Sequence, residues 1–422
     1  MMKHLTTTAL GLLLAAGTVS AAELTVLVDS NPVNVAAFEA LTAAYTAQNP
    51  DITFSIDVRP TGGEGDNLVK TMLATGEMAD IFSYNSGSLL AALRPSRTLV
   101  PINELANIGN LNGSFLSTVA DDAGNYYGVP YEAAMGGGIF YHIPTYEALG
   151  LEVPTTWADF MANNAVIAER TDKVPVIQTY GDTWTSQLFV LADYFNIQAA
   201  KPDFAASYTA NEAKYATTPE AVAGFGRLQE TYEAGYFNAD FGAATLEDGM
   251  RMVATGAGVH YPMLTFAIGS IQQNNPEQIN DVGFFALPGD GDVSGLTIWM
   301  SAAAYIPRSS SNIQAAKDFL NFMASAEGCQ VIVDTNGATG PYLVEGCEIP
   351  SDVPRAVSDM LPYFEEEGRT APALEFLSPI KGPALQQLTV EVGTGIRDAQ
   401  SAAELYDQDV AKQARQLGLE GW

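Results

Sequence analysis

Residues Asn125 to Phe160 read NYYGVPYEAAMGGGIFYHIPTYEALGLEVPTTWADF and combine two strand patterns, a run of glycines and a helix start. Apolar, strand-forming residues flank Gly136 to Gly138, which we expect to form a flexible bend because glycine adopts backbone angles barred to other residues. Thr156, with Asp159 three residues later, predicts the start of a helix. The block is either a connection between two lobes or an ordinary strand-loop-strand of a single-domain α/β enzyme.

The segments before this block alternate between strand and helix patterns. Strands are predicted at 23–28, 52–58 and 80–84, and helices at 33–48 and 66–75, where apolar residues recur on one face. This repeated βαβ pattern predicts a mainly parallel sheet covered by helices. Ligands of such sheets collect at the carboxyl ends of the strands.

The rest of the chain continues the α/β pattern. Strands are expected at 174–178 and 282–288, and helices at 218–235, at 311–323 and from Ser401 onward. A chain of 422 residues is too long for one core of typical size. It fits two lobes of roughly 150 to 250 residues each.

The N-terminus has the layout of a secretory signal peptide. Lys3 precedes an apolar run from Leu5 to Val19, and small residues follow before Glu23, so residues 1–22 are predicted to be removed. No cysteine lies near that site to take a lipid anchor. No later window holds the ~18 uninterrupted apolar residues of a membrane helix. We therefore expect a periplasmic protein without a lipid anchor.

The chain is strongly acidic, with a formal net charge of −30. Removal of the signal segment takes out Lys3 and leaves 18 basic against 49 acidic residues, or −31. This charge argues against nucleic acid and anionic membrane surfaces as partners. The acidic residues are spread along the whole chain, which favours a role in solubility over recognition of a cationic ligand.

The two cysteines, Cys329 and Cys347, lie 18 residues apart. In an oxidising compartment such a pair predicts one local disulfide, which stabilises the fold by roughly 3 kcal/mol. Two free thiols are the alternative. Neither cysteine has a histidine in its segment, which argues against a thiol nucleophile.

Six segments occur in the order found in one known family. They are FEALTAAYTAQNPDITFSIDV, LVKTMLATGEMADIFSYNSGSLLAAL, YYGVPYEAAMGGGIFYH, TTWADF, DVGFFALPG and IQAAKDFLNFMASAEGCQ. In this order they resemble the extracellular solute-binding proteins of carbohydrate ABC importers, the group similar to maltose-binding protein. The resemblance implies an α/β, two-lobed periplasmic binding protein fold with a hinge and an interlobe ligand cleft. It also implies a monomer that delivers its ligand to permease subunits in the inner membrane.

In this family the chain crosses the hinge three times, so each lobe is built from separate segments. The resemblance places the N-terminal lobe at 23–131 plus 283–332. It places the C-terminal lobe at 132–282 plus 333–422.

Candidate ligand-binding residues combine aromatic rings with polar side chains, because sugar rings offer flat C–H faces and a rim of hydroxyls. Those near the first-lobe strand ends and the hinge are Asn31, Glu64, Asp66, Tyr84, Asn85 and Glu132. Those from the second lobe and its return segment are Asp182, Trp184, Tyr261, Phe266 and Trp299.

The resemblance supports several of these positions individually. Tyr84 and Asn85 stand where similar proteins carry an aromatic and polar pair, and Glu132 matches a sugar-binding carboxylate. Asp182 and Trp184 occupy a turn where the family presents an aromatic ring. Tyr261 or Phe266 is expected at the family's tryptophan platform. The chain departs from the family there, because that segment has no tryptophan.

A secreted carbohydrate-active enzyme is the alternative from another class, since carboxylates and aromatic rings also serve glycoside hydrolysis. His142 and His260, the histidines after the signal segment, are not in an HExxH arrangement. The chain has no G-x-S-x-G elbow and no phosphate-binding loop. We therefore expect a binding protein for a neutral mono- or oligosaccharide, with no enzymatic activity and no cofactor.

Two other ligands stay open within the binding proteins. A ferric-ion binder would use tyrosines such as Tyr126 and Tyr127. A polyamine binder would use several acids, which Glu64, Asp66, Glu132 and Asp182 supply. The charge of the cleft separates these possibilities, because a polycation requires several acids close together.

No metal site is predicted from the sequence. The segment that begins at Asp290 resembles the start of a calcium loop, but Ser301 stands where the twelfth-position glutamate is required. A surface turn is the simpler interpretation.

Overall fold

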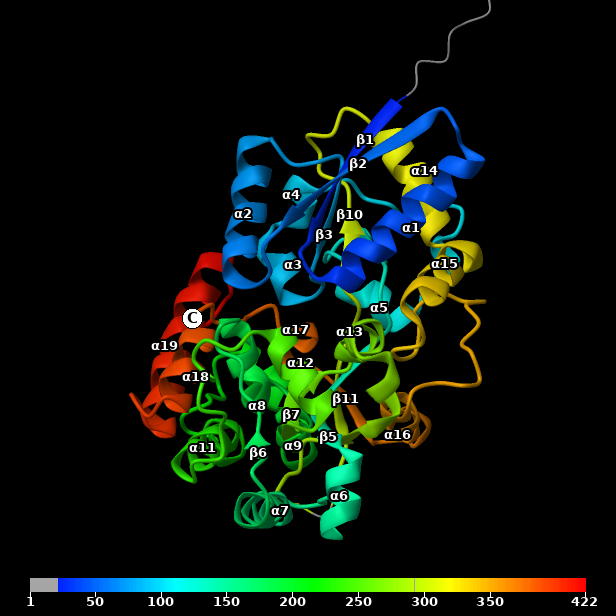
Figure 1. Ribbon diagram of the computed structural model, residues 1–422. Helices are drawn as coiled ribbons and strands as arrows, with labels where there is room; N and C mark the ends of the chain where they lie inside the picture. Colours follow the sequence, from blue (N-terminus) through cyan, green and yellow to red (C-terminus); the bar gives the residue numbers. More distant parts are fainter. Residues whose placement is uncertain (1–21, 292) are drawn as a thin grey trace, which may run out of the picture.

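The computed structural model describes residues 22–291 and 293–422, and it contains two β-sheets (Figure 1). The predicted signal peptide, apart from Ala22, lies outside the described residues. In Figure 1 the first sheet lies in the upper part of the molecule and the second in the lower part. We call the two parts, each a sheet with its helices, the first and the second lobe.

The first sheet has the strand order β2-β1-β3-β10-β4. Its strands are β1 (Ala22–Asp29), β2 (Ile52–Arg59), β3 (Ile81–Tyr84), β4 (Gly128–Pro130) and β10 (Ala303–Tyr305). β1 pairs in parallel with both β2 and β3, as the βαβ pattern predicts, while β10 runs antiparallel to β3 and β4. The carboxyl ends of β1, β2 and β3 therefore open on the same edge of the sheet.

The helices of the first lobe come from two separate parts of the chain, one before β4 and one after β10. They are α1 (Pro32–Gln48), α2 (Gly62–Thr75), α3 (Ser88–Ala92), α4 (Pro95–Thr98), α5 (Gly113–Thr118), α14 (Ile313–Met323) and α15 (Ala326–Asn336), with a 3₁₀ turn at Ile108–Asn110. α1 begins at a cap formed by Asn31, whose side chain accepts a hydrogen bond from the Val33 amide, with proline at the first helical position. α15 packs against α1.

The second sheet is built around β5. Its strands are β5 (Met135–His142), β6 (Val174–Val176), β7 (Gly258–Leu264), β8 (Val282–Ala286), β9 (Leu296–Trp299) and β11 (Thr370–Pro372), in the order β11-β9-β5-β7-β6, with β8 also paired to β5. All eight residues of β5 are buried. β5 is antiparallel to β7, β8 and β9, so this sheet is mixed rather than mainly parallel.

Most helices of the described chain belong to the second lobe. They are α6 (Ile143–Leu149), α7 (Trp157–Arg170), α8 (Leu188–Leu191), α9 (Tyr194–Ala200), α10 (Phe204–Thr209), α11 (Pro219–Glu233), α12 (Leu246–Thr255), α13 (Ala267–Asn274), α16 (Arg355–Glu365), α17 (Leu374–Leu377), α18 (Leu385–Gly393) and α19 (Ala399–Leu417), with 3₁₀ turns at Thr183–Gln187 (η2) and Pro276–Asp281. α7 begins as predicted, with Thr156 capping the amide of Asp159. α19 begins at Ala399, two residues before the expected start at Ser401, and is capped by Asp398.

The glycine run does not form the expected bend. Gly136 to Gly138 lie inside β5, and none of the three has a positive φ. Glycine is required at these positions because a side chain would not fit. A Cβ on Gly137 would lie 2.5 Å from the Trp299 ring, and one on Gly138 would lie 2.4 Å from the Phe285 carbonyl oxygen. These glycines let neighbouring strands and one large aromatic ring approach β5 closely.

The chain passes between the two sheets at three places that lie side by side. The first is 131–134, between β4 and β5, and the second is 300–302, between β9 and β10. A hydrogen bond links these two passages, with the Glu132 amide donating to Ser301 Oγ over 3.0 Å. The third passage follows α15, where the Ala134 amide donates to the Pro341 carbonyl over 2.8 Å.

One predicted lobe boundary differs from this arrangement. The predicted N-terminal lobe includes 283–332, but β8 and β9 pair with β5 of the second sheet, so the chain returns to the first sheet only after Trp299. The strand pattern at 282–288 shows that the segment is apolar and extended. It carries no information about which sheet supplies its hydrogen-bonding partner.

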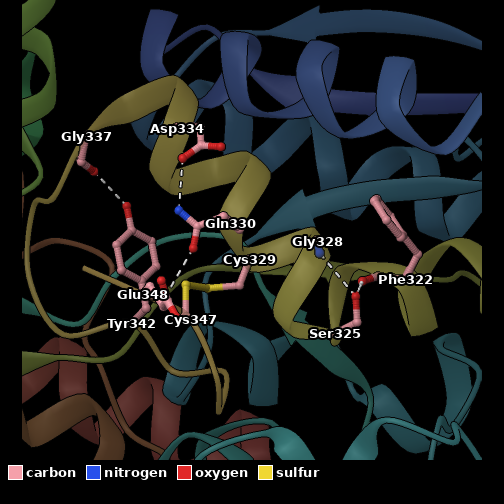
Figure 2. Close-up of a disulfide and its surroundings, with 10 residues drawn as sticks. All are labelled: Phe322, Ser325, Gly328, Cys329, Gln330, Asp334, Gly337, Tyr342, Cys347 and Glu348. Carbon is pink, nitrogen blue, oxygen red and sulfur yellow. Dashed lines mark hydrogen bonds between the residues drawn. A yellow bond between two sulfur atoms is a disulfide. The ribbon is translucent and has the colours of Figure 1, made fainter. Parts of the chain in front are cut away.

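A disulfide joins Cys329 of α15 to Cys347 (Figure 2). It is the pairing that the sequence analysis expected. The segment after α15 is held further by Gln330, whose side-chain oxygen accepts from the Glu348 amide, and by Tyr342, whose hydroxyl donates to the Gly337 carbonyl (Figure 2). The start of the third passage is thereby anchored to the first lobe.

Candidate functional site

A cavity of about 640 Å³ lies between the two lobes. Its lining includes the ends of β1 and β2 and the residues just after β3 on one side, and residues around η2, β7, β9 and α17 on the other. This volume is within the range of small-molecule sites, roughly 300–1,000 Å³. The cavity is therefore the candidate binding site.

The second lobe contributes an aromatic wall. Its large aromatic residues are Trp184, Phe266, Trp299 and Phe376. The Trp184 and Phe266 rings lie 6.1 Å apart with their planes inclined by 38°. Trp299 packs with Met135 in a small apolar cluster that Phe266 and Phe376 extend. Flat apolar rings of this kind suit the C–H faces of a sugar.

Trp299 is fixed in place from two sides. The absence of a side chain at Gly137 leaves room for the ring, and Trp299 Nε1 donates to Glu375 Oε1 over 2.5 Å. Lys381 Nζ holds the other oxygen of the same carboxylate at 3.0 Å. Only 7% of Trp299 is exposed, so the residue forms a rigid part of the wall.

The first lobe contributes a polar wall. Its lining includes Asp29, Asn31, Arg59, Asp66 and Asn85. Asp29 and Arg59 end β1 and β2, while Asn31 and Asn85 follow β1 and β3, and these strand ends open on one edge of the sheet. Asp66 lies in α2, the helix that follows β2. They supply both donors and acceptors, as the recognition of hydroxyl groups requires.

Glu132 lies between the walls, on the first passage between the sheets. Its Oε2 accepts a hydrogen bond from the Ala302 amide of the second passage over 3.2 Å. Burial, reinforced by the negative charge of Asp29, raises the pKa of Glu132 to about 7. The Asn34 amide bonds both oxygens of Asp29 and also stabilises the charged form of Glu132. The carboxylates of Asp29 and Glu132 thus both line the cavity, and both interact with the side-chain amide of Asn34.

Asp66 is an acid of the cavity that lies among several cations. Burial raises its pKa, while the positive charges of Arg59, Lys70 and Lys381 lower it. Arg59 and Lys70 belong to the first lobe and Lys381 to the second. The cavity is therefore not a continuous acidic surface, which weighs against a polycationic ligand.

Eight of the eleven sequence-predicted ligand-binding residues line the cavity: Asn31, Asp66, Asn85, Glu132, Asp182, Trp184, Phe266 and Trp299. Two of these polar side chains already have structural tasks. Asn31 caps α1, and Asp182 Oδ2 accepts from the Leu246 amide at the start of α12 over 2.8 Å.

Three predicted residues do not line it. Tyr84 and Tyr261 are each only 1% exposed and belong to the core. The Tyr261 hydroxyl bonds Thr179 over 2.9 Å, so Phe266, not Tyr261, supplies the ring on that segment. Glu64 is exposed in the first turn of α2 and is not part of the cavity lining. The sequence shows that a tyrosine lies in a strand or that an acid lies in a helical turn, but it does not show whether the side chain faces the cleft.

Sequence reasoning missed several lining residues. Asp29 and Arg59 end strands that had been recognised, so their position was a usable signal. Glu375, Phe376 and Lys381 come from the segment around α17, for which no ligand role was predicted. Only tertiary packing of that segment against β9 and α3 brings it to the cavity.

The tyrosines considered for iron lie elsewhere. Tyr127 is buried and its hydroxyl donates to Asp121 Oδ2 over 2.6 Å. Neither Tyr126 nor Tyr127 lines the cavity. Within residues 22–291 and 293–422, no three His, Cys, Asp or Glu side chains are grouped so as to hold a metal ion.

Two lobes joined by three adjacent passages, with a mixed polar and aromatic cavity between them, define a cleft-type binding protein. The chain belongs to the family of bacterial extracellular solute-binding proteins, whose pattern matches residues 29–328. Among the helices of the described residues, none combines the length and apolarity needed to cross a membrane.

Known proteins resemble both the sequence and the fold. The chain is 22% identical over 312 residues to the multiple sugar-binding protein of Streptococcus mutans, with 72% of this chain and 70% of that protein covered. The fold is similar to that of a chitin oligosaccharide binding protein, with a TM-score of 0.82, 18% identity and coverage of 94% of this chain and 100% of that one. It is also similar to RafE in complex with raffinose, with a TM-score of 0.74, 20% identity and coverage of 94% and 99%.

Proposed function

We propose that this protein is the periplasmic substrate-binding component of an ABC importer and that it binds a neutral mono- or oligosaccharide by hinge closure. The observation that carries the proposal is the pairing of an aromatic wall with a polar wall across one cavity. A sugar ring has both surfaces that this pairing requires: C–H faces for the rings of Trp184 and Trp299, and hydroxyls for the polar side chains.

The names of the relatives agree with this assignment. The sequence relative is a multiple sugar-binding protein, and the structural relatives bind chitin oligosaccharide or raffinose. Similar folds are also known bound to stachyose and to α-D-tagatose. These relatives are named binding proteins or, for the stachyose complex, a sugar transporter, which supports transport over catalysis.

The passages between the lobes provide the mechanism. Open and closed arrangements differ by rotation about the hinge, and a ligand that touches both walls favours the closed one through its extra contacts there. We place the moving segments at 131–134 and 300–302, where Glu132 and Ser301 hydrogen-bond each other. The closed face then docks on the permease subunits, with the receptor acting as a monomer after removal of its signal peptide.

A thermal-shift and calorimetric screen tests this function. The mature protein is assayed with raffinose, stachyose, D-tagatose, D-galactose and chitin oligosaccharides, and in parallel with spermidine and ferric citrate. A ligand that binds only the folded state raises the melting temperature. Binding of a sugar with closure detected as a smaller radius of gyration supports the proposal. Binding of spermidine or ferric citrate alone overturns the sugar assignment, and turnover of an oligosaccharide overturns the transport role.

A further inference from the structure

One basic side chain reaches the cavity from the second-lobe wall. Among the described residues, three basic side chains line the cavity: Arg59 and Lys70 of the first lobe and Lys381 of the second. Arg59 is 6% exposed, and both of its terminal nitrogens donate to backbone carbonyls of its own lobe. Lys70 is exposed on α2. The Lys381 side chain is 18% exposed, so it is packed against the protein and still open to the cavity.

The ammonium group of Lys381 is held in place by Glu375. Lys381 Nζ donates to Glu375 Oε2 over 3.0 Å, and the other oxygen of that carboxylate accepts from Trp299 Nε1 over 2.5 Å. The Glu375 side chain is only 10% exposed, so this bridge has little freedom to move. An ammonium group has three N–H donors, and the hydrogen bonds among the described residues use one of them. Two donors are therefore available to a ligand.

The shared carboxylate places this ammonium group beside the edge of the Trp299 ring. The indole N–H lies in the plane of the ring, so the carboxylate that accepts from it lies at the ring edge and not over the ring face. Lys381 itself is not among the cations that stand over an aromatic ring in the described residues. A sugar that stacks on an aromatic face directs its equatorial hydroxyls sideways, past the ring edge. A donor at that edge can therefore meet the rim of the stacked sugar.

An acceptor of the first lobe lies within reach of the same charge. Burial raises the pKa of Asp66, and the positive charge of Lys381 is one of those that oppose the rise. The lobes approach each other here, since α17 contacts α3 and a Cβ on Gly87 would lie 2.7 Å from the Glu375 carbonyl oxygen. Neighbouring hydroxyls of one sugar ring can then accept from Lys381 and donate to Asp66. The carboxylates of Asp66 and Glu375 disfavour an anionic group at this place.

We propose that Lys381 is a specificity-determining ligand contact, which donates to one hydroxyl of the sugar ring that stacks on Trp299. A neighbouring hydroxyl of that ring donates to Asp66, so a single ring joins the two walls on this side of the cavity. This inference rests on the proposed function and deepens it, because it names the donor that reads the rim of the ring from the wall that holds its face.

The Lys381→Met variant tests this contact, because it keeps a long side chain and removes the ammonium group. Calorimetry uses the sugar that binds the wild type most tightly among raffinose, stachyose, D-tagatose, D-galactose and chitin oligosaccharides. The affinity is expected to fall at least about tenfold, as for the loss of a charged hydrogen bond. Lys201→Met is the matched control, since Lys201 is a second-lobe lysine that pairs with Glu220 outside the cavity lining. Its affinity should equal that of the wild type.

Monodeoxy derivatives of the same sugar separate a ligand contact from a structural role of Lys381. Loss of the hydroxyl that Lys381 contacts should weaken binding to the wild type about tenfold and have little further effect in Lys381→Met, because the donor is already absent. Loss of any other hydroxyl should weaken binding by the same factor in both proteins. If every derivative weakens binding equally in the two proteins, Lys381 does not contact the ligand and the proposal is overturned.

A second variant keeps the test valid if Lys381→Met does not fold. The single variant leaves the Glu375 carboxylate with one partner, whereas Glu375→Gln combined with Lys381→Met removes both charges and keeps an acceptor for Trp299. Circular dichroism and the melting temperature show which variants are folded, and the double variant should lose the same affinity. Wild-type affinity in either folded variant overturns the role of Lys381 and leaves the sugar function intact. Failure of every sugar to bind the wild type overturns both.

Discussion

The two walls of the cavity differ in the forces they offer to a ligand. The first-lobe wall presents polar side chains at the ends of parallel strands, and the second-lobe wall presents Trp184, Phe266, Trp299 and Phe376. Neither wall alone is a sugar site, since stacking without hydrogen bonds leaves hydroxyls unpaired and hydrogen bonds without stacking lose most of the apolar contact. The contrast shows that affinity requires both lobes, which is the physical basis of closure around a ligand.

The largest effect is expected from the deepest aromatic ring. Trp299→Ala leaves a void over Gly137 of β5 and removes one of the two partners of Glu375, so the free energy of unfolding should fall by about 3–5 kcal/mol. Urea denaturation measures the loss of stability, and calorimetry measures the effect on sugar binding. Trp299→Phe keeps most of the ring and is expected to lose less than half of that stability. An equal loss of unfolding free energy in the two variants would show that packing of the Trp299 ring does not stabilise the aromatic wall.

The disulfide lies away from both walls and separates stability from binding. Replacing Cys329 and Cys347 together by serine should lower the free energy of unfolding by roughly 3 kcal/mol, because the unfolded chain regains the freedom of the closed loop. Sugar affinity measured at a temperature where the variant is folded should stay within about twofold of the wild type. A large change in affinity would mean that the third passage between the lobes depends on the disulfide.

Glu132 lies at the junction of the walls and predicts a dependence on pH. Its pKa is about 7 in the folded protein against an ordinary value of 4.5, so the stabilising protonated form is fully present below about pH 4.5 and is lost as the pH rises through about 7. Across that window the wild type should lose about 1–3 kcal/mol relative to Glu132→Gln. Denaturation of both proteins from pH 4.5 to 8 measures the difference, and a constant difference would contradict the raised pKa.

The smallest effect is expected at the partly exposed ring. Trp184→Ala should weaken sugar binding by at least about 1 kcal/mol, or roughly fivefold, with little loss of stability. Trp184→Phe retains a stacking surface and should recover most of the affinity. If Trp184→Ala binds as tightly as the wild type by calorimetry, the aromatic wall begins at Phe266 and excludes Trp184.

Prediction from sequence succeeded where the signal was local. The βαβ pattern before residue 84 correctly placed the parallel strands of the first sheet, and the Thr156 cap correctly placed the start of α7. Polar residues directly after those strands, such as Asn31 and Asn85, were brought to the cavity for the same reason. In each case the position along a regular element sets the position in space.

Prediction failed where the outcome depended on distant partners. The glycines at 136–138 predict a bend, but they lie inside β5, where Trp299 and Phe285 leave no room for a side chain. Tyr261 and Tyr84 were read as ligand contacts, but their strands turn them into the core. Local sequence records residue type and spacing, and it does not record which surface covers them.

The sequence by itself determined that this protein is an acidic, two-lobed α/β chain of the solute-binding family with one pair of cysteines, because periodicity, charge and ordered motifs are properties of the chain alone. Only the tertiary structure decided that β8 and β9 join the second sheet and that Glu375 and Lys381 reach the cavity. Those facts depend on contacts between segments that are distant in the sequence, which no local pattern encodes.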